Sequence, residues 1–185
     1  LEILRTFLTL LTEGSARPLR VVLGFAGALD DLLLAAADQV PPDELAAALS
    51  RRRRDLPGGA APTFRRLVTH GLPARPEELG PAAAPRLERL LAICEQLSRE
   101  IPEVTLSIDL AEFVHQSLDP RLLDHAGFRA YYDGILFRGY AGRRGLPVGA
   151  GGRYDRLFRG LGADVSAVGF SVDLERLMNG EEDRP

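Results

Sequence analysis

The chain has 185 residues, 45% of them hydrophobic, and a formal net charge of −3, which fits one domain with a core of normal size. Acidic and basic residues are interspersed and all 23 basic residues are arginine, so composition gives no reason to expect a nucleic-acid partner. No apolar run reaches the roughly 18 residues of a membrane span. The single cysteine, Cys94, cannot form an internal disulfide, which favours a reducing compartment. We therefore expect a cytoplasmic protein with no membrane segment.

The first half of the chain alternates helical and strand patterns. An apolar stripe at helical spacing predicts a helix from Ile3 to Leu11, and no capping residue precedes it, so we expect the chain to be part of a longer one. Leu19–Phe25 is typical of a buried strand, and residues 28–37 of a packed helix. Residues 40–85 mix short helical pieces with Pro- and Gly-rich breaks, which predicts a small helical insertion on the surface.

The second half predicts strands joined by short turns. A helix is expected over residues 86–99, followed by strands at 104–113, 131–141, 146–152 and 167–172. Short helices are expected over residues 153–161 and after Val172. Strands joined in this way favour an antiparallel sheet with helices packed on it, an α+β fold.

Two patterns in this half are candidates for binding chemistry. Gly149–Asp155 predicts a glycine turn that brings main-chain N–H groups near a ligand, with Tyr154 facing the pocket and Asp155 capping the next helix. A purely structural turn remains the alternative. In the Tyr131–Tyr132 pair, strand alternation predicts that Tyr131 faces the core and Tyr132 faces the cleft. A core position for both rings is the alternative.

Other charged groups carry weaker signals. Arg176 could bind phosphate oxygens, or it could pair with Asp173 or Glu175 on the same surface. The run Arg51–Arg54 is expected to be a solvated helix end rather than a nucleic-acid patch. The three histidines, His70, His115 and His125, lack metal-ligand spacing, so no metal site and no cofactor are expected.

The stretch Tyr131–Leu177 resembles the C-terminal half of the catalytic core of histidyl-tRNA synthetase and its non-synthetase relatives. The resemblance is firm over residues 107–177 and weaker over 1–99. It implies a class II synthetase-like core, only part of which is present, without an anticodon-binding domain. It also implies a pocket for a histidine-like side chain, lined by Tyr131, Tyr132, Gly151, Gly152, Arg153 and Tyr154.

Two departures from the synthetase pattern bear on one reaction. The arginine that serves histidine activation is replaced by Gly127, with Arg129 two positions further on. In the third class II motif, Gly169 and the phosphate arginine Arg176 are kept, but Asp173 replaces the glycine beneath the adenine. The resemblance therefore implies a vestigial nucleotide site at Gly169, Asp173 and Arg176, and no catalytic residues.

This combination is similar to the regulatory subunits of ATP phosphoribosyltransferase. That resemblance implies a non-catalytic protein that binds the short-form catalytic subunit and no nucleic acid, and that helps to transmit feedback inhibition by histidine. It also implies a homodimer within a hetero-oligomer. A fragment of histidyl-tRNA synthetase and a stand-alone amino-acid sensor on the same core are the alternatives.

Overall fold

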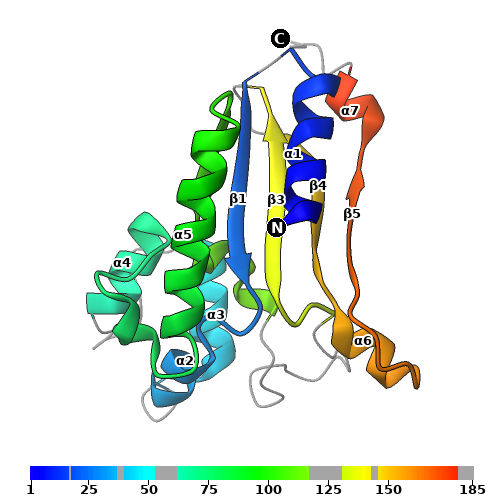
Figure 1. Cartoon of the computed structure of the whole chain (residues 1–185). Coiled ribbons are helices and arrows are strands. Elements are labelled where there is room, and N and C mark those ends of the chain that lie inside the picture. Colours follow the sequence, from blue (N-terminus) through cyan, green and yellow to red (C-terminus); the bar gives the residue numbers. More distant parts are fainter. Residues whose placement is uncertain (17, 37–39, 53–61, 117–130, 143–145, 179–185) are drawn as a thin grey trace.

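The computed structural model describes residues 1–16, 18–36, 40–52, 62–116, 131–142 and 146–178. Its centre is a five-stranded sheet in the order β2-β1-β3-β4-β5 (Figure 1). In chain order the strands are β1 (Leu19–Phe25), β2 (Val104–Ile108), β3 (Ile135–Ala141), β4 (Leu146–Arg153) and β5 (Val168–Val172). The predicted α+β class is confirmed.

The sheet is mixed rather than wholly antiparallel. Strands β1, β3, β4 and β5 pair antiparallel, as expected, whereas β1 and β2 pair parallel with Leu19 opposite Val104. Parallel neighbours need a long crossover connection. The helices between Phe25 and Val104 provide it, because they return the chain to the end of the sheet at which β1 began.

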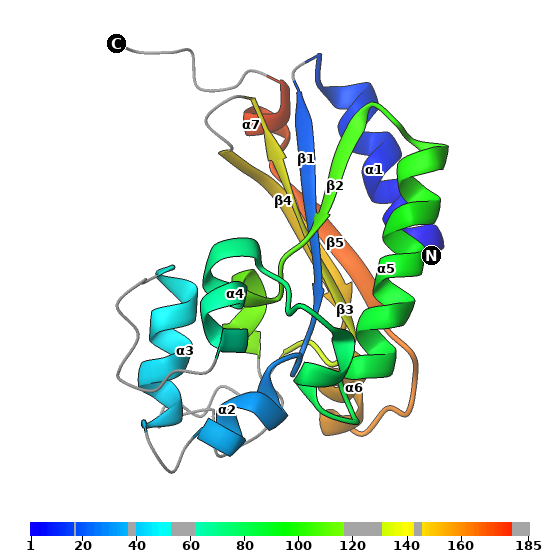
Figure 2. The same ribbon diagram turned by 90° about the vertical axis from the view of Figure 1, so that its left-hand side faces the viewer.

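One face of the sheet carries the long helices α1 (Glu2–Gly14) and α5 (Ala84–Glu100), which lie on the same side in Figure 2. The predicted apolar stripe of α1 is its buried side: Leu4, Phe7, Leu8 and Leu11. The Phe7 ring packs at 4.8 Å from Phe137 and 5.2 Å from Phe170 (centroid to centroid). Helix α1 therefore packs across β3 and β5 on this face of the sheet.

The described residues of the predicted helical insertion, 40–52 and 62–85, pack into the core rather than lying on the surface. They contain α3 (Pro42–Ser50), α4 (Pro62–His70) and the 3₁₀ turn η1 (Pro76–Leu79), after α2 (Asp30–Ala36). Leu45, Leu49 and Leu67 are fully buried and belong to the same apolar cluster as the sheet. Figure 2 places α3 and α4 on the side of the sheet away from α1 and α5.

The predicted strand over residues 104–113 ends early, at Ile108. Asp109 Oδ1 accepts hydrogen bonds from the backbone N–H groups of Ala111 (3.1 Å) and Glu112 (3.2 Å). This side-chain acceptor competes with strand pairing and starts a helical turn instead. Residues Leu110–Gln116 therefore form the 3₁₀ helix η2.

The remaining elements lie near their predicted positions. Helix α6 (Asp155–Gly160) follows β4, and α7 (Leu174–Met178) follows β5. Cys94 is half-buried in α5, and burial raises the pKa of its thiol. Among the helices of the described residues, none is long and apolar enough to cross a membrane.

Candidate functional site

Three tyrosines meet at the end of the sheet where β3 begins and β4 ends. The ring centroids of Tyr131 and Tyr132 are 4.8 Å apart, those of Tyr131 and Tyr154 5.3 Å, and those of Tyr132 and Tyr154 6.2 Å. These spacings fall within the range of interacting aromatic pairs. The prediction that Tyr132 and Tyr154 come within side-chain reach is confirmed, and we call these three residues the tyrosine cluster.

The expected core position of Tyr131 is wrong. Both Tyr131 and Tyr132 precede β3, which starts only at Ile135, so strand alternation does not govern their side chains. Tyr131 is 41% exposed, whereas Tyr132 is half-buried against the apolar cluster of Val22, Ala26, Phe113 and Leu136. Burial raises the pKa of the Tyr132 hydroxyl, and the neighbouring Tyr131 and Tyr154 raise it further.

The glycines of the sequence motif lie inside β4 rather than in a turn, because the strand continues to Arg153. A Cβ on Gly152 would meet Tyr132 Cδ1 at 2.8 Å, and a Cβ on Gly169 would meet the Tyr154 hydroxyl at 2.5 Å. A Cβ on Gly151 would lie only 2.4 Å from the Gly169 carbonyl oxygen. Gly152 and Gly169 are thus where the backbone makes room for the tyrosine rings.

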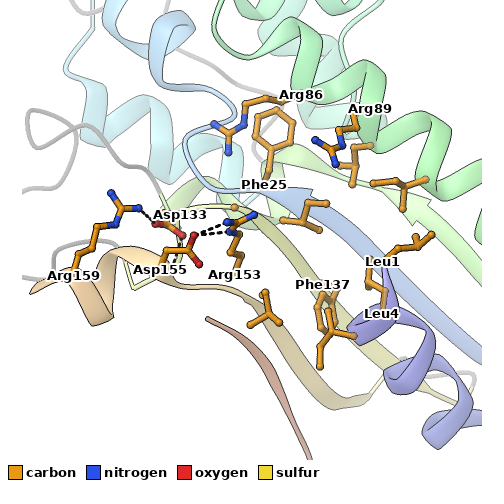
Figure 3. Close-up of a pocket in the computed structure, with 17 residues that line it drawn as sticks. Leu1, Leu4, Phe25, Arg86, Arg89, Asp133, Phe137, Arg153, Asp155 and Arg159 are labelled. Carbon is orange, nitrogen blue, oxygen red and sulfur yellow. Dashed lines mark hydrogen bonds and ion pairs between the residues drawn. The ribbon is translucent and has the colours of Figure 1, made fainter. Parts of the chain in front are cut away.

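Arg153 does not join the tyrosine cluster. Its guanidinium binds Asp155 Oδ2 (Nε to Oδ2, 2.8 Å) and donates to Ser166 Oγ (3.2 Å). It lines a cavity of about 590 Å³ on the sheet face that carries α1 and α5, together with Phe25, Phe137 and Arg86 (Figure 3). Strand alternation explains the separation, because Gly152 and Arg153 are adjacent and face opposite sides.

The expected capping role of Asp155 is also wrong, since Asp133 caps α6 instead. Asp133 accepts hydrogen bonds from the backbone N–H of Asp155 (3.1 Å, Oδ1) and of Arg156 (2.8 Å, Oδ2), and it lies 3.5 Å from Arg159. Asp155 instead accepts from the backbone N–H of Ala167 (2.8 Å), which ties α6 to the start of β5.

Replacing Asp133 by alanine is expected to destabilise the protein by about 1 kcal/mol, the usual cost of a lost helix cap. The change removes the two carboxylate oxygens that accept from backbone N–H groups at the start of α6, directly beside the tyrosine cluster. Chemical denaturation measures the effect. Asp164→Ala is the control, because its side chain is 97% exposed; an equal loss for both variants would contradict the capping role.

The Asp155 carboxylate makes stability depend on pH in the acid range. Its hydrogen bond with Arg153, and then the bond from Ala167 N–H, hold its pKa below the ordinary 3.8. A lowered folded-state pKa adds stability above the ordinary value, and this stability is lost as the pH falls through the folded-state pKa. In Asp155→Asn, acid titrations followed by circular dichroism should therefore show less loss of stability below pH 3.8 than wild type shows.

Two residues of the third motif, Asp173 and Arg176, lie after the end of β5, at the start of α7. Asp173 Oδ1 accepts from the backbone N–H of Arg176 (3.0 Å), and Asp173 Oδ2 lies 3.1 Å from Arg176 Nε. Arg176 Nη1 also donates to the Pro147 carbonyl (3.4 Å). Of the two roles considered for Arg176, pairing with Asp173 is the one that the structure shows. Gly169, at the other end of β5, lies under Tyr154 instead.

Sequence reasoning missed a second polar group on the face of the sheet that carries Tyr132. Glu112 Oε1 accepts hydrogen bonds from the Tyr140 hydroxyl and from Arg138 Nη1 (3.0 Å). The Arg20 guanidinium lies 4.6 Å from the centre of the Tyr140 ring. Because Arg138 and Tyr140 are two positions apart in β3, strand alternation could have placed them on one face of the sheet. Their shared partner, Glu112, comes from η2 and could not be found in this way.

Some predictions fall outside the described residues. Gly127, Arg129 and His125 belong to residues 117–130, and Arg53 and Arg54 to residues 53–61. Arg52 is described and is not a solvated helix end, because it forms an ion pair with Asp109. Within the described ranges, no three His, Cys, Asp or Glu side chains lie close enough to hold a metal ion.

Comparison with known proteins extends these observations to a family. The family model described as histidyl-tRNA synthetase matches residues 1–177. An ATP phosphoribosyltransferase regulatory subunit of Pseudomonas fluorescens is 32% identical over 173 residues, which are 89% of this chain and 40% of that protein. One from Anaeromyxobacter sp. is 36% identical over 166 residues, 88% of this chain and 45% of that protein. The chain thus spans less than half the length of these relatives.

Solved structures share the fold. The ATP phosphoribosyltransferase regulatory subunit/histidyl-tRNA synthetase of Bacillus halodurans matches with a TM-score of 0.67 at 20% identity, over 97% of this chain and 48% of that one. A chain of the ATP phosphoribosyl transferase complex of Thermotoga maritima matches with a TM-score of 0.67 at 20% identity, over 94% and 60% of the two chains. The chain therefore belongs to the histidyl-tRNA synthetase family, and curated relatives of it are ATP phosphoribosyltransferase regulatory subunits.

Proposed function

We propose that this chain is part of a non-catalytic regulatory subunit of ATP phosphoribosyltransferase in the cytoplasm. In this role the protein forms a homodimer within a hetero-oligomer and binds the short-form catalytic subunit. It supports the activity of that subunit and helps to pass on feedback inhibition by histidine.

The observation that carries the proposal is the ion pair between Asp173 and Arg176. At the position of Arg176, a synthetase needs a free arginine to bind the phosphates of ATP. At the position of Asp173, it needs a glycine so that the adenine base has a flat surface to pack on. In this chain the carboxylate lies 3.1 Å from the guanidinium and competes with any phosphate for it. It also adds negative charge where a nucleotide would lie, which disfavours binding of an anionic ligand.

The tyrosine cluster supports the other half of the proposal, retention of a pocket for histidine. The ring centroids of Tyr132 and Tyr154 lie 6.2 Å apart, and the two rings pack on the glycine backbone at Gly152 and Gly169. An imidazole ring can pack against such rings and hydrogen-bond their hydroxyls. A site that keeps the pocket for the histidine side chain, but has lost the surface on which the adenine base packs, is suited to sensing an amino acid rather than activating it.

Co-elution with the catalytic subunit of ATP phosphoribosyltransferase in size-exclusion chromatography tests the proposal. We expect a stable complex, with histidine binding to the complex measured by equilibrium dialysis. Histidine binding without complex formation would favour a stand-alone amino-acid sensor. Formation of histidyl-adenylate, without such a complex, would favour a histidyl-tRNA synthetase.

A further inference from the structure

Arg52 has an unusual backbone conformation for its residue type. Its φ is +53°, in the left-handed region that favours glycine. The residue follows Arg51, the C-cap of α3, and its N–H donates to the Leu49 carbonyl (3.1 Å). A non-glycine residue keeps such a conformation when its surroundings hold it there. We therefore expect the side-chain contacts of Arg52 to hold this conformation.

The Arg52 guanidinium joins two segments far apart in the sequence. Nη1 donates to the Leu67 carbonyl in α4 (3.1 Å), and Nη2 forms an ion pair with Asp109 Oδ2 at the end of β2. The planar fork of arginine suits this double contact, which the single ammonium of lysine does not reproduce. One side chain thus ties α3 and α4 of the helical insertion to the sheet.

Asp109, which Arg52 binds, also forms hydrogen bonds with η2. Its second oxygen, Oδ1, accepts from the N–H groups of Ala111 and Glu112, and its own N–H donates to the Leu23 carbonyl in β1 (3.0 Å). Gly71, at φ +73°, allows the insertion to approach closely, since a Cβ there would lie 2.5 Å from Asp109 Cγ. The position of the Glu112 backbone therefore depends on the carboxylate that Arg52 holds.

Glu112 in turn binds two polar side chains of β3 on the sheet face that carries Tyr132. Its Oε1 accepts from Tyr140 and Arg138. Tyr132 and Tyr140 both pack against the small apolar cluster of Val22, Ala26, Phe113 and Leu136. The positive charge of Arg138 lowers the pKa of Tyr132, against the larger effect of burial, so the two groups interact electrostatically.

We propose that Arg52 is a positioning residue that couples the helical insertion to the tyrosine cluster, through Asp109, Glu112 and Arg138. Docking of α3 and α4 then sets the position of Glu112 and Arg138, and with it the affinity of the cluster for its ligand. The identity of that ligand as histidine rests on the proposed function. The coupling itself does not.

The variant Arg52→Gly tests the coupling, because glycine accepts the backbone conformation and removes only the side-chain contacts. The chain has four tyrosines and no tryptophan, so ultraviolet absorbance follows tyrosine ionisation without interference. Burial and the hydrogen bond with Glu112 raise the pKa of Tyr140. If Arg52 positions Glu112, the variant shows one tyrosine ionising at lower pH than in wild type.

Arg52→Lys is the second variant, which keeps the charge and the side-chain bulk but not the fork. It should lower the pH at which the same tyrosine ionises, but by a smaller amount. The control Arg51→Ala changes an exposed neighbouring residue and should leave the titration unchanged. A wild-type titration in both Arg52 variants would overturn the coupling.

The second readout is the histidine concentration that half-inhibits the complex of this protein with the catalytic subunit. We expect it to rise about tenfold in Arg52→Gly, within the range seen for changes along a coupled network, and to stay unchanged in Arg51→Ala. Equal inhibition of Arg52→Gly and wild type would overturn the coupling. If wild type itself neither binds nor stimulates the catalytic subunit, the proposed function fails, and the tyrosine titration still decides whether Arg52 positions Glu112.

Discussion

With histidine and ATP, the protein is expected to exchange pyrophosphate into ATP no faster than the background rate. Adenylation requires neutralisation of charge that develops on the α-phosphate. Gly127 offers no cation for this, and Arg176 is paired with Asp173. Loss of one electrostatic contact of this type costs about 10²–10³ in rate, and here two are affected together.

The variant Asp173→Gly is the matched control for this prediction. It removes the partner of Arg176 and restores the synthetase residue, yet exchange should stay at background because Gly127 still supplies no cation. Exchange by wild type that is abolished in Arg129→Ala would contradict the prediction, since Arg129 would then replace the missing arginine.

Replacing Phe7 by alanine is expected to destabilise the protein by about 3–5 kcal/mol, the usual cost of removing a buried phenylalanine ring. Phe7 is fully buried and packs between Phe137 and Phe170. Its ring also fills the space above Gly139 and Gly149, where added Cβ atoms would lie 3.0 and 2.9 Å from it. Alanine would leave a cavity between α1 and the sheet.

Urea denaturation of the protein measures this effect, as a shift of the midpoint at constant slope. Leu10→Ala in the same helix is the control, because Leu10 is 37% exposed and should cost far less. Similar midpoints for Phe7→Ala and Leu10→Ala would contradict the account of how α1 packs.

Periodicity predicted the elements whose own residues decide their structure. The stripe of α1 and the apolar run of β1 needed no distant partner to be recognised, and β1 was placed at Leu19–Phe25, as observed. The proximity of Tyr132 and Tyr154 came from resemblance to a family rather than from local pattern. Pattern alone gave no reason to bring together two rings 22 positions apart.

Features that depend on contacts between distant segments could not be read from the sequence. Asp133 caps a helix that begins at Asp155, and Glu112 of η2 binds two residues of β3. The parallel pairing of β2 depends on how the helical insertion returns the chain. Strand alternation does not place the Tyr131 side chain, because Tyr131 precedes β3.

The most direct test of the regulatory role is the rate of phosphoribosyl transfer to ATP by the catalytic subunit, alone and with this protein. We expect the protein to raise the rate and histidine then to lower it, with Tyr132→Ala reducing the effect of histidine but not complex formation. A rate that the protein leaves unchanged, with and without histidine, would contradict the account.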